Sequence, residues 1–388
     1  MRYMMRLMTY PSFDAVVVGL GAMGSATIHA LAKRGLRVLG LDLFTPPHQK
    51  GSTHGRTRII REAYYEHPLY VPLVQQAYRA WSDLERESGR ALFLRTGGMM
   101  LGPPEGELVA GARSSAERHG LPHELLDAPR IRELFPAFAP EEDMIGLLEP
   151  RAGLLLPELC VESLLELARA SGAVLRFGEC FERWDAAGEH LRVTTDAGRY
   201  QTRKVVLAMG PWMPGQLAGL ELPLEVERQL FHWFEPRSRP ELFEPARCPI
   251  TLWEYAPGRM FAGFPDLGDG FKAGIHHEGE ITDPASVRRA ITDEDTGSIR
   301  ALLERYLPDA NGRLREARVC LYTNTPDHHF LIDAHPEEAR VILASPCSGH
   351  GFKFASAIGE LVAALVMDEA PRFDLSPFAV ERFRGARP

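Results

Sequence analysis

The fold is decided by residues 13–42, which read FDAVVVGLGAMGSATIHALAKRGLRVLGLD. The first seven residues form a short β-branched run, which is typical of a buried parallel strand. A glycine-rich turn follows, and residues 25–35 then indicate a helix that ends at a glycine. Residues 36–42 form a second apolar strand that closes on an aspartate. The stretch therefore predicts a strand, a turn, a helix and a second strand, as in a nucleotide-binding unit.

The glycines of the turn have G-x-G-x-x-G spacing, and each has a mechanical reason. Gly19 allows the tight turn, Gly21 lets a pyrophosphate approach the backbone, and Gly24 lets the helix pack closely on the strand. The helix N-terminus attracts phosphates, and Asp42, 18 residues past Gly24, can bind ribose hydroxyls. The alternative is a glycine-rich turn without a ligand. The cofactor-binding candidates in this unit are Gly19, Gly21, Ala22, Met23, Gly24 and Asp42.

Composition excludes several classes of protein. The chain has 388 residues, of which 45% are hydrophobic and 25% charged, and its net charge is −8. This suits a globular protein of two or three domains, and the lack of a basic tract argues against a nucleic-acid partner. No run approaches the roughly 18 apolar residues of a membrane helix.

The cysteines and the N-terminus indicate the compartment. Five scattered cysteines do not suggest a disulfide framework, so a reducing environment fits better. Residues 1–12 lack the apolar core of a signal peptide. We therefore expect a short flexible leader on a cytoplasmic protein with no membrane partner.

The segment after Asp42 indicates which dinucleotide binds. A simple NAD dehydrogenase would continue with another strand and helix, whereas residues 44–67 form a polar loop rich in Gly, Pro and His. A discontinuous nucleotide domain of this kind favours FAD, whose long body needs several segments to hold it. The later parts of that domain are a helix at 160–172, a strand at 173–184, a hairpin leading into a buried strand over 191–212, and a strand, loop and helix over 340–366.

Two other stretches differ in character. Residues 94–150 carry charged helical segments and a Pro-rich turn, and residues 225–324 alternate aromatic and polar residues as antiparallel strands do. They predict a substrate domain built on a sheet over the cofactor, and an α/β fold that is α+β overall. The predicted divisions are a leader at 1–12, a discontinuous Rossmann-like FAD-binding domain of 13–93, 151–224 and 325–388, and a substrate domain of 94–150 and 225–324.

Five motifs carry a resemblance to a known family. In chain order, and spread over about residues 13–375, they resemble the monomeric sarcosine oxidase family of flavoprotein amine oxidases, which includes N-methyltryptophan oxidase and pipecolate oxidase. The resemblance implies a D-amino-acid-oxidase-like fold with a glutathione-reductase-type FAD domain. It also implies a monomer whose partners are a small amino acid and O2. The motifs are GLGAMG (19–24), FTPPHQKGSTHGRTRIIREAY (44–64), GFKAGIHH (270–277), CLYTNTPDHHFLID (320–333) and SGHGFKFASAIGE (348–360).

The resemblance assigns residues beside the flavin. Cys320 would join its sulfur to the flavin 8-methyl carbon and so raise the potential of the ring, whereas the alternative is a buried strand cysteine. Lys272 would lie over the ring and stabilise charge that develops on oxygen, and its alternative is a solvated strand lysine. Tyr322 would share the face of Cys320 if this segment is a strand. The predicted catalytic residues are Lys272, His276, Arg58 and Tyr322.

The resemblance also assigns a carboxylate site. Arg58 and Arg61 are three residues apart and share a face if the segment is helical. The first would lie by the flavin, and the second, with Lys353, would hold the substrate carboxylate, for which a guanidinium fork is suited. The alternative is a pair of surface arginines. The predicted substrate-binding residues are Arg61, Lys353, Tyr64, Ala262 and Cys347.

Further residues are expected around the cofactor. His54 matches a family histidine near the flavin, and Gly349 and Gly351 would let the backbone approach the ring. Trp212 either packs near the cofactor or belongs to the core. No cluster of histidine and cysteine has the spacing of a zinc site, so we expect no metal. The remaining predicted cofactor-binding residues are Ser52, Arg58, Cys180, Phe181, Gly210, Cys320 and Lys353.

Two positions depart from the family pattern. A tyrosine that lines the cavity in sarcosine oxidase aligns with Ala262, and the position of Cys347 is usually aromatic. Both changes would enlarge the cavity, so a secondary amino acid bulkier than sarcosine is expected to fit.

These assignments imply an oxidase of an N-methyl or cyclic secondary α-amino acid. The amine would become an imine, O2 would become H2O2, and N-methyl substrates would release formaldehyde. The alternatives are a pipecolate- or proline-type oxidase, a flavin dehydrogenase with another electron acceptor, an NAD-dependent dehydrogenase, and a non-catalytic nucleotide-binding subunit. The last two would not explain Cys320 or the presence of Lys272, Arg61 and Lys353 together.

Overall fold

The computed structural model describes residues 10–220 and 222–383. Most of the predicted leader, residues 1–9, lies outside the described residues. Its last residue, Ser12, already belongs to the first strand, β1 (Ser12–Val18). The chain therefore enters its core immediately after the predicted leader.

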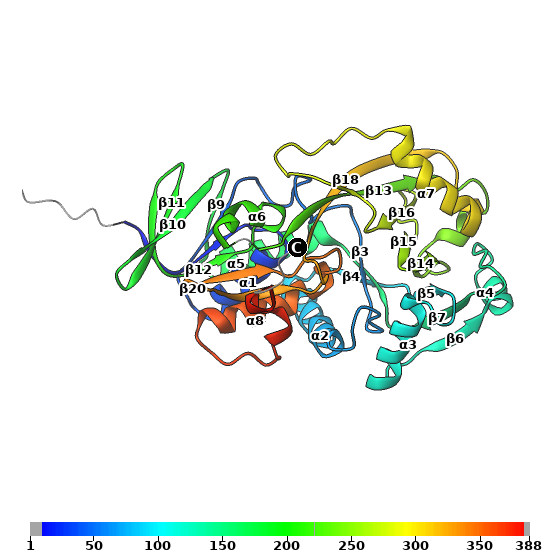
Figure 1. Ribbon diagram of the computed structural model, residues 1–388, viewed down its shortest axis with the longest axis horizontal. Coiled ribbons are helices and arrows are strands. Elements are labelled where there is room, and N and C mark those ends of the chain that lie inside the picture. Colours follow the sequence, from blue (N-terminus) through cyan, green and yellow to red (C-terminus); the bar gives the residue numbers. More distant parts are fainter. Residues whose placement is uncertain (1–9, 221, 384–388) are drawn as a thin grey trace, which may run out of the picture.

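A sheet with a parallel centre, the parallel sheet, occupies one end of the molecule (Figure 1). Four parallel pairings give the central order β20-β12-β1-β2-β9, in which β1 and β2 are the two strands that residues 13–42 predicted. The antiparallel strands β10 and β11 extend β12, and β19 pairs with β20. The other strands are β2 (Val38–Asp42), β9 (Val174–Phe177), β10 (Phe181–Ala187), β11 (His190–Thr195), β12 (Arg199–Leu207), β19 (Leu331–His335) and β20 (Glu338–Ser345).

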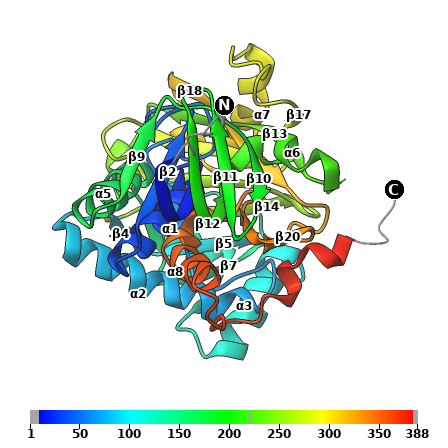
Figure 2. The ribbon, with the colours of Figure 1, turned by 90° about the vertical axis from the view of Figure 1, so that its left-hand side faces the viewer.

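Both faces of the parallel sheet are covered, which explains why its strands are apolar throughout. Ala15 and Val17 pack into one core cluster with the helices, whereas Val16 and Val18 pack into a second cluster on the other face. Helix α1 packs against α5 and α8, and all of its residues from Ala22 to Ala32 are buried. The helices around the parallel sheet are α1 (Ala22–Lys33), α2 (Tyr70–Ser88), α5 (Pro157–Ala170) and α8 (Ala355–Val366) (Figure 2). The short helix α6 (Met213–Gln216) follows β12.

A larger sheet, the mixed sheet, lies at the other end of the molecule (Figure 1). It is antiparallel apart from one parallel pair, β14 with β5. Its strands are β5 (Gly98–Gly102), β6 (Glu124–Asp127), β7 (Ile145–Glu149), β13 (Glu225–Phe234), β14 (Ile250–Ala256), β15 (Arg259–Phe264), β16 (Phe271–His276), β17 (Glu280–Ile281) and β18 (Leu314–Asn324). The helices beside it are α3 (Glu107–His119), α4 (Ala128–Leu134) and α7 (Asp293–Tyr306).

Alternation along these strands separates a core face from a site face. Trp253, Phe261, Phe271 and Phe234 pack into one core cluster with residues of α7. The intervening residues face the other way. Register pairs Leu252 with Ala262, Ala262 with Gly274, and Phe264 with Lys272 across β14, β15 and β16. The antiparallel strands predicted over 225–324 are thus confirmed, and they present one continuous face to the site.

Two local predictions need correction. Residues 173–184 were expected to form one strand, but they form β9 and β10, because Gly178 turns the chain with a φ of 72°. The segment of Arg58 and Arg61 is not helical. Arg58–Ile60 is strand β3, which pairs with β8 (Gly153–Leu155), and β8 also pairs with β4 (Phe93–Arg95). Because a strand alternates its faces, Arg58 and Arg61 point to different surroundings.

Candidate active site

A cavity of about 480 Å³ joins the glycine turn of the parallel sheet to the site face of the mixed sheet. At one end it is lined by Gly19, Gly21 and Asp42, and at the other by His276 and Lys353. The loop that leads from β20 to α8, the opening of the predicted SGHGFKF motif, also reaches it. Segments far apart in the sequence therefore form one site.

The glycine turn has the geometry that its spacing predicted. Gly19 has a φ of 85°, and a Cβ there would lie 2.5 Å from the carbonyl oxygen of Ala208. A Cβ on Gly24 would lie 1.7 Å from the carbonyl oxygen of Gly19, so helix and strand touch at this point. The Ala22 amide at the start of helix α1 donates to Thr53 Oγ1 at 3.2 Å, and Gly21, Ala22 and Met23 line the cavity. The positive end of the helix therefore opens into the cavity.

Asp42 closes β2 at the same end. Its Oδ2 accepts a hydrogen bond from the Leu20 amide at 2.7 Å, and its Oδ1 accepts one from the Phe44 amide at 2.8 Å. These bonds fix the carboxylate against the glycine turn. The predicted cofactor residues Ser52, Cys180, Phe181, Gly210 and Trp212 also line the cavity, as does Glu179, which was not predicted.

Cys320 lies on β18 and lines the cavity, together with Tyr322 two residues further along the strand. Its sulfur is 3.6 Å from Nη2 of Arg58 and 3.6 Å from the carbonyl oxygen of Ser52. Burial raises the pKa of the Cys320 thiol, and attraction to Arg58 and Lys272 opposes that rise. The structure thus brings together the cysteine, arginine and tyrosine that were predicted to lie beside a flavin.

Lys272 is buried, with 1% of its surface exposed. Its ammonium donates to the carbonyl oxygens of Gly55 and Thr57, both at 2.8 Å, and to the Thr57 hydroxyl at 3.0 Å. The same nitrogen lies 4.2 Å from the ring centre of Phe231 and 4.3 Å from that of Phe264, and these two rings line the cavity. The Lys272 ammonium therefore lies directly behind the rings of Phe231 and Phe264, which form the cavity wall.

Two histidines predicted for the site have different positions. His276 lines the cavity, and its Nδ1 lies 3.1 Å from the hydroxyl of Tyr322. Burial, with repulsion from His277 and His350, holds the pKa of His276 well below its usual value. His54 is not one of the described residues that line the cavity. Burial and the cations of Arg58 and Lys272 lower its pKa to about 3.

Arg61 and Lys353 both line the cavity, as predicted for a carboxylate site. The Arg61 guanidinium lies 4.4 Å and the Lys353 ammonium 5.1 Å from the ring centre of Tyr64. Tyr64 is buried behind these two cations and is not one of the described residues that line the cavity. Its hydroxyl is 3.3 Å from the Lys353 ammonium and 2.5 Å from Nδ1 of His350. Burial and repulsion from Arg61 lower the pKa of Lys353 to about 7, although Glu66 opposes the shift.

Glu66 is a lining residue that the sequence did not predict. Its Oε2 is 2.7 Å from Nη2 of Arg61, while Nη1 of Arg61 donates to the Ala63 carbonyl oxygen at 2.8 Å. Burial alone would raise the pKa of Glu66, but attraction to Arg61, His350 and Lys353 lowers it. Among the described residues, the buried Nε of Arg61 has no hydrogen-bond partner. That orphaned donor points to a ligand.

Ala262 and Cys347 both line the cavity, Ala262 from β15 and Cys347 from the loop before α8. Gly349 and Gly351 line it as well, and a Cβ on Gly349 would lie 2.7 Å from the ring of Tyr322. Burial raises the pKa of Cys347 to about 11, so its thiol is protonated and acts as a neutral wall group. Within residues 10–220 and 222–383, His, Cys, Asp and Glu form no group suited to a metal ion.

Comparisons with known proteins agree with this geometry. The family described as FAD dependent oxidoreductase matches residues 14–365. Monomeric sarcosine oxidase of Streptomyces avermitilis is 40% identical over 380 residues, which cover 97% of this chain and 99% of that protein. N-methyl-L-tryptophan oxidase of Yersinia pestis is 35% identical over 374 residues, covering 96% and 100%. The solved structure of NikD, an unusual amino acid oxidase essential for nikkomycin biosynthesis, is 25% identical with a TM-score of 0.82, over 95% of this chain and 97% of that one.

Proposed function

This chain belongs to the family of FAD dependent oxidoreductases that includes monomeric sarcosine oxidase and N-methyl-L-tryptophan oxidase, and we propose that it oxidises N-methyl or cyclic secondary α-amino acids. The observation that carries the proposal is a single cavity with a dinucleotide turn at one end and the cations Arg61 and Lys353 at the other. The first feature suits FAD, and the second suits the carboxylate of an amino acid.

The residues present fit FAD. The start of α1, where Gly21, Ala22 and Met23 line the cavity, would receive the pyrophosphate, and Asp42 would bind the ribose. Cys320 would hold the flavin through a thioether, with Arg58 beside it to favour the thiolate. Bound FAD supplies the two-electron chemistry, accepting electrons from the amine and passing them to dioxygen. We also propose the predicted domain boundaries and a monomeric state, and the curated relative from Streptomyces carries the word monomeric in its name.

The substrate is held by its carboxylate. Nε of Arg61, which has no partner among the described residues, and the Lys353 ammonium would bind the two carboxylate oxygens, and both cations are fixed by packing on Tyr64. Glu66 competes for Arg61 when no substrate is bound. Fixing the carboxylate at one end of the cavity orients the α-amine and its C–H bonds, and such positioning supplies much of the rate.

The amine must lose its proton before it is oxidised. Arg58, Arg61 and Lys353 line the cavity beside the carboxylate of Glu66, and an excess of nearby positive charge lowers the pKa of an ammonium group. His276 adds no charge, because its own pKa is held well below the usual range. The substrate therefore binds as a neutral amine beside His276 and Tyr322, and no separate general base is required.

The products follow from the bond that is oxidised. Loss of a hydride equivalent, that is two electrons and one proton, from the N-methyl carbon of the neutral amine gives the protonated imine. Water then adds to its carbon and releases formaldehyde and the protonated primary amino acid. A cyclic substrate keeps its imine within the ring. The electrons reduce O2 to H2O2, and the buried Lys272 ammonium supplies fixed positive charge behind the cavity wall, where negative charge develops on oxygen.

The size of the substrate is set by the wall residues. Ala262 and Leu252 present small or flexible aliphatic groups from the mixed sheet, and Cys347 presents a thiol from the loop before α8. We propose that this space accepts a side chain larger than the hydrogen of sarcosine.

The test is anaerobic mixing of the purified yellow protein with sarcosine, bulkier N-methyl amino acids, pipecolate and proline. Loss of flavin absorbance with an N-methyl amino acid is the expected result, and preference for a ring substrate would favour the cyclic-amine alternative. An NAD-dependent dehydrogenase or a non-catalytic subunit would give no bleaching with any of them. No helix in the described part of the chain is long and apolar enough to cross a membrane.

A further inference from the structure

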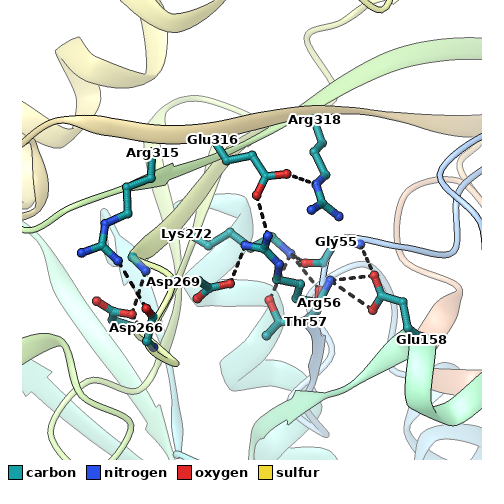
Figure 3. Close-up of polar contacts among 12 residues, drawn as sticks. Gly55, Arg56, Thr57, Glu158, Asp266, Asp269, Lys272, Arg315, Glu316 and Arg318 are labelled. Carbon is teal, nitrogen blue, oxygen red and sulfur yellow. Dashed lines mark hydrogen bonds and ion pairs between the residues drawn. The ribbon is translucent and has the colours of Figure 1, made fainter.

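Residues 55–57 form a short segment that carries the Lys272 ammonium, and we call it the saddle. The acceptors for that ammonium in the described structure are the carbonyl oxygens of Gly55 and Thr57 and the Thr57 hydroxyl (Figure 3). All of them are neutral. The position of the charge therefore depends on the backbone geometry of the saddle.

The first restraint on the saddle comes from helix α5. Glu158 lies in the first turn of that helix, where a carboxylate is favoured by the helix dipole. Its Oε1 accepts from the Gly55 amide at 2.8 Å and from the Arg56 amide at 3.1 Å, and its Oε2 also accepts from the Arg56 amide at 3.1 Å. The amides of the saddle thus bind Glu158, while its carbonyls bind Lys272 (Figure 3).

The second restraint comes from the side chain of Arg56. Its φ of 66° lies in the left-handed region, which an arginine rarely adopts without support. Its Nη1 binds Oδ2 of Asp269 at 2.6 Å, and its Nη2 binds Oε2 of Glu316 at 2.5 Å. One guanidinium therefore ties the saddle to the loop before β16 and to strand β18, as Figure 3 shows.

The mixed sheet links these restraints to Lys272. In its register Trp233 pairs with Lys272 on one side and with Glu316 on the other, so the three share one row. The guanidinium of Arg56 packs over Trp233 at 4.9 Å, and the Lys272 ammonium lies 5.5 Å from the same ring. Arg56 therefore holds the saddle against the strands from which Lys272 and Cys320 project.

We propose that Arg56 and Glu158 are positioning residues that fix the saddle and thereby hold the Lys272 ammonium at the cavity wall for the reaction with oxygen. The inference rests on the oxidase function proposed above. Neither side chain lines the cavity as described, so each acts through the backbone of residues 55–57. Loss of either restraint should affect the step that needs Lys272 and leave substrate binding at Arg61 and Lys353 intact.

The experiment separates the two half-reactions. The flavin of each purified holoenzyme is reduced by light or dithionite, without substrate, and mixed with oxygen in a stopped-flow instrument. Glu158→Gln and Arg56→Ala are compared with wild type, with Lys272→Met as the benchmark. Glu166→Gln is the matched control, because Glu166 lies on the same helix and pairs at the surface with Arg90.

The expected result is an oxygen reaction slowed on the order of tenfold to a hundredfold in both saddle variants, since small displacements of a positioned group cost this much. Reduction by substrate should stay within about twofold of wild type, which a general loss of structure would not allow. Burial and the Arg58 cation hold the pKa of Lys272 well below its usual value, and Glu158 opposes that shift. In Glu158→Gln the ammonium should therefore be lost earlier as the pH is raised, so the pH above which the oxygen reaction slows should be lower than in wild type. Arg56→Lys should recover part of the rate.

Two outcomes would overturn the positioning role of Arg56 and Glu158. Saddle variants that reoxidise at the wild-type rate while Lys272→Met is slow would overturn the positioning role alone. A Lys272→Met variant that reoxidises as fast as wild type would overturn the role of the lysine and, with it, the saddle. If Arg56→Ala does not fold, Asp269→Asn weakens the same restraint and leaves the bonds to Glu158 in place, so the same comparison holds.

Discussion

The sulfur of Cys320 lies 3.6 Å from Nη2 of Arg58, at the wall of the cavity that links the glycine turn to the carboxylate site. This pairing makes Cys320 the cysteine best suited to a covalent flavin link, because a neighbouring cation favours the reactive thiolate. Acid precipitation of the wild-type protein should give a yellow pellet. Cys320→Ser should release its flavin into the supernatant, and Cys347→Ser should keep the pellet yellow. A colourless wild-type pellet would contradict the linkage.

Titration of Lys353 should make the binding of a carboxylate ligand depend on pH. Its pKa of about 7 means that the ammonium is charged below pH 7 and neutral above it. Propionate, which has no amine to titrate, should therefore bind the holoenzyme best below pH 7. Its Kd should rise by about tenfold per pH unit above that value, as expected for one linked proton. The flavin absorbance change on titration measures this Kd.

A control isolates Lys353 from the other ionisable groups of the site. His276 and His350 have lowered pKa values and stay neutral over this range, and Glu66, whose pKa is also lowered, stays ionised. Lys353→Met should bind propionate weakly and with little dependence on pH. Equal Kd values for wild type at pH 6 and pH 9 would show that Lys353 is not the titrating group.

Ala262 should determine substrate size. It lies between Leu252 and Gly274 in the register of the mixed sheet and faces the cavity. Ala262→Tyr should lower kcat/KM for a bulky N-methyl amino acid by at least about tenfold relative to sarcosine, the effect of roughly 1.4 kcal/mol of lost fit. Steady-state kinetics with the two substrates give the ratio. An unchanged ratio would place the substrate side chain elsewhere.

A side chain at position Gly24 should weaken both the fold and the binding of FAD. A Cβ there would lie 1.7 Å from the Gly19 carbonyl oxygen, so Gly24→Ala must push α1 away from the turn. We expect a loss of about 2–4 kcal/mol in the free energy of unfolding, typical of severe overpacking, together with a low flavin content. Urea unfolding and absorbance spectra measure both. Gly198→Ala, which has open space around it, should change neither.

Local pattern and motif spacing predicted the framework well. The strand, glycine turn and helix over 13–42 depend on short-range periodicity and on Gly19 and Gly24, and the structure confirms them. The alternation over 225–324 likewise predicted the strands that carry Lys272, His276, Cys320 and Tyr322.

The remaining features depend on distant partners. The segment around Arg58 has no helical structure, because pairing with β8, almost a hundred residues away, makes it a strand. Glu66 and Glu158 could not be assigned, since a carboxylate in a sequence does not reveal which cation or amide it will meet. Lys272 was expected over the flavin ring. Its ammonium lies behind the rings of Phe231 and Phe264 because it bonds to the saddle, a segment more than 200 residues earlier in the chain, and the sequence does not reveal that contact.

The most direct test of the proposed function is the stoichiometry of turnover in air. Oxygen uptake, peroxide and formaldehyde are measured together while the wild-type holoenzyme consumes a known amount of an N-methyl α-amino acid. The expected result is one O2 consumed, and one H2O2 and one formaldehyde formed, per substrate molecule. Substrate oxidation without oxygen uptake, supported only by an added quinone or protein acceptor, would make the protein a dehydrogenase and contradict the proposed oxidase function.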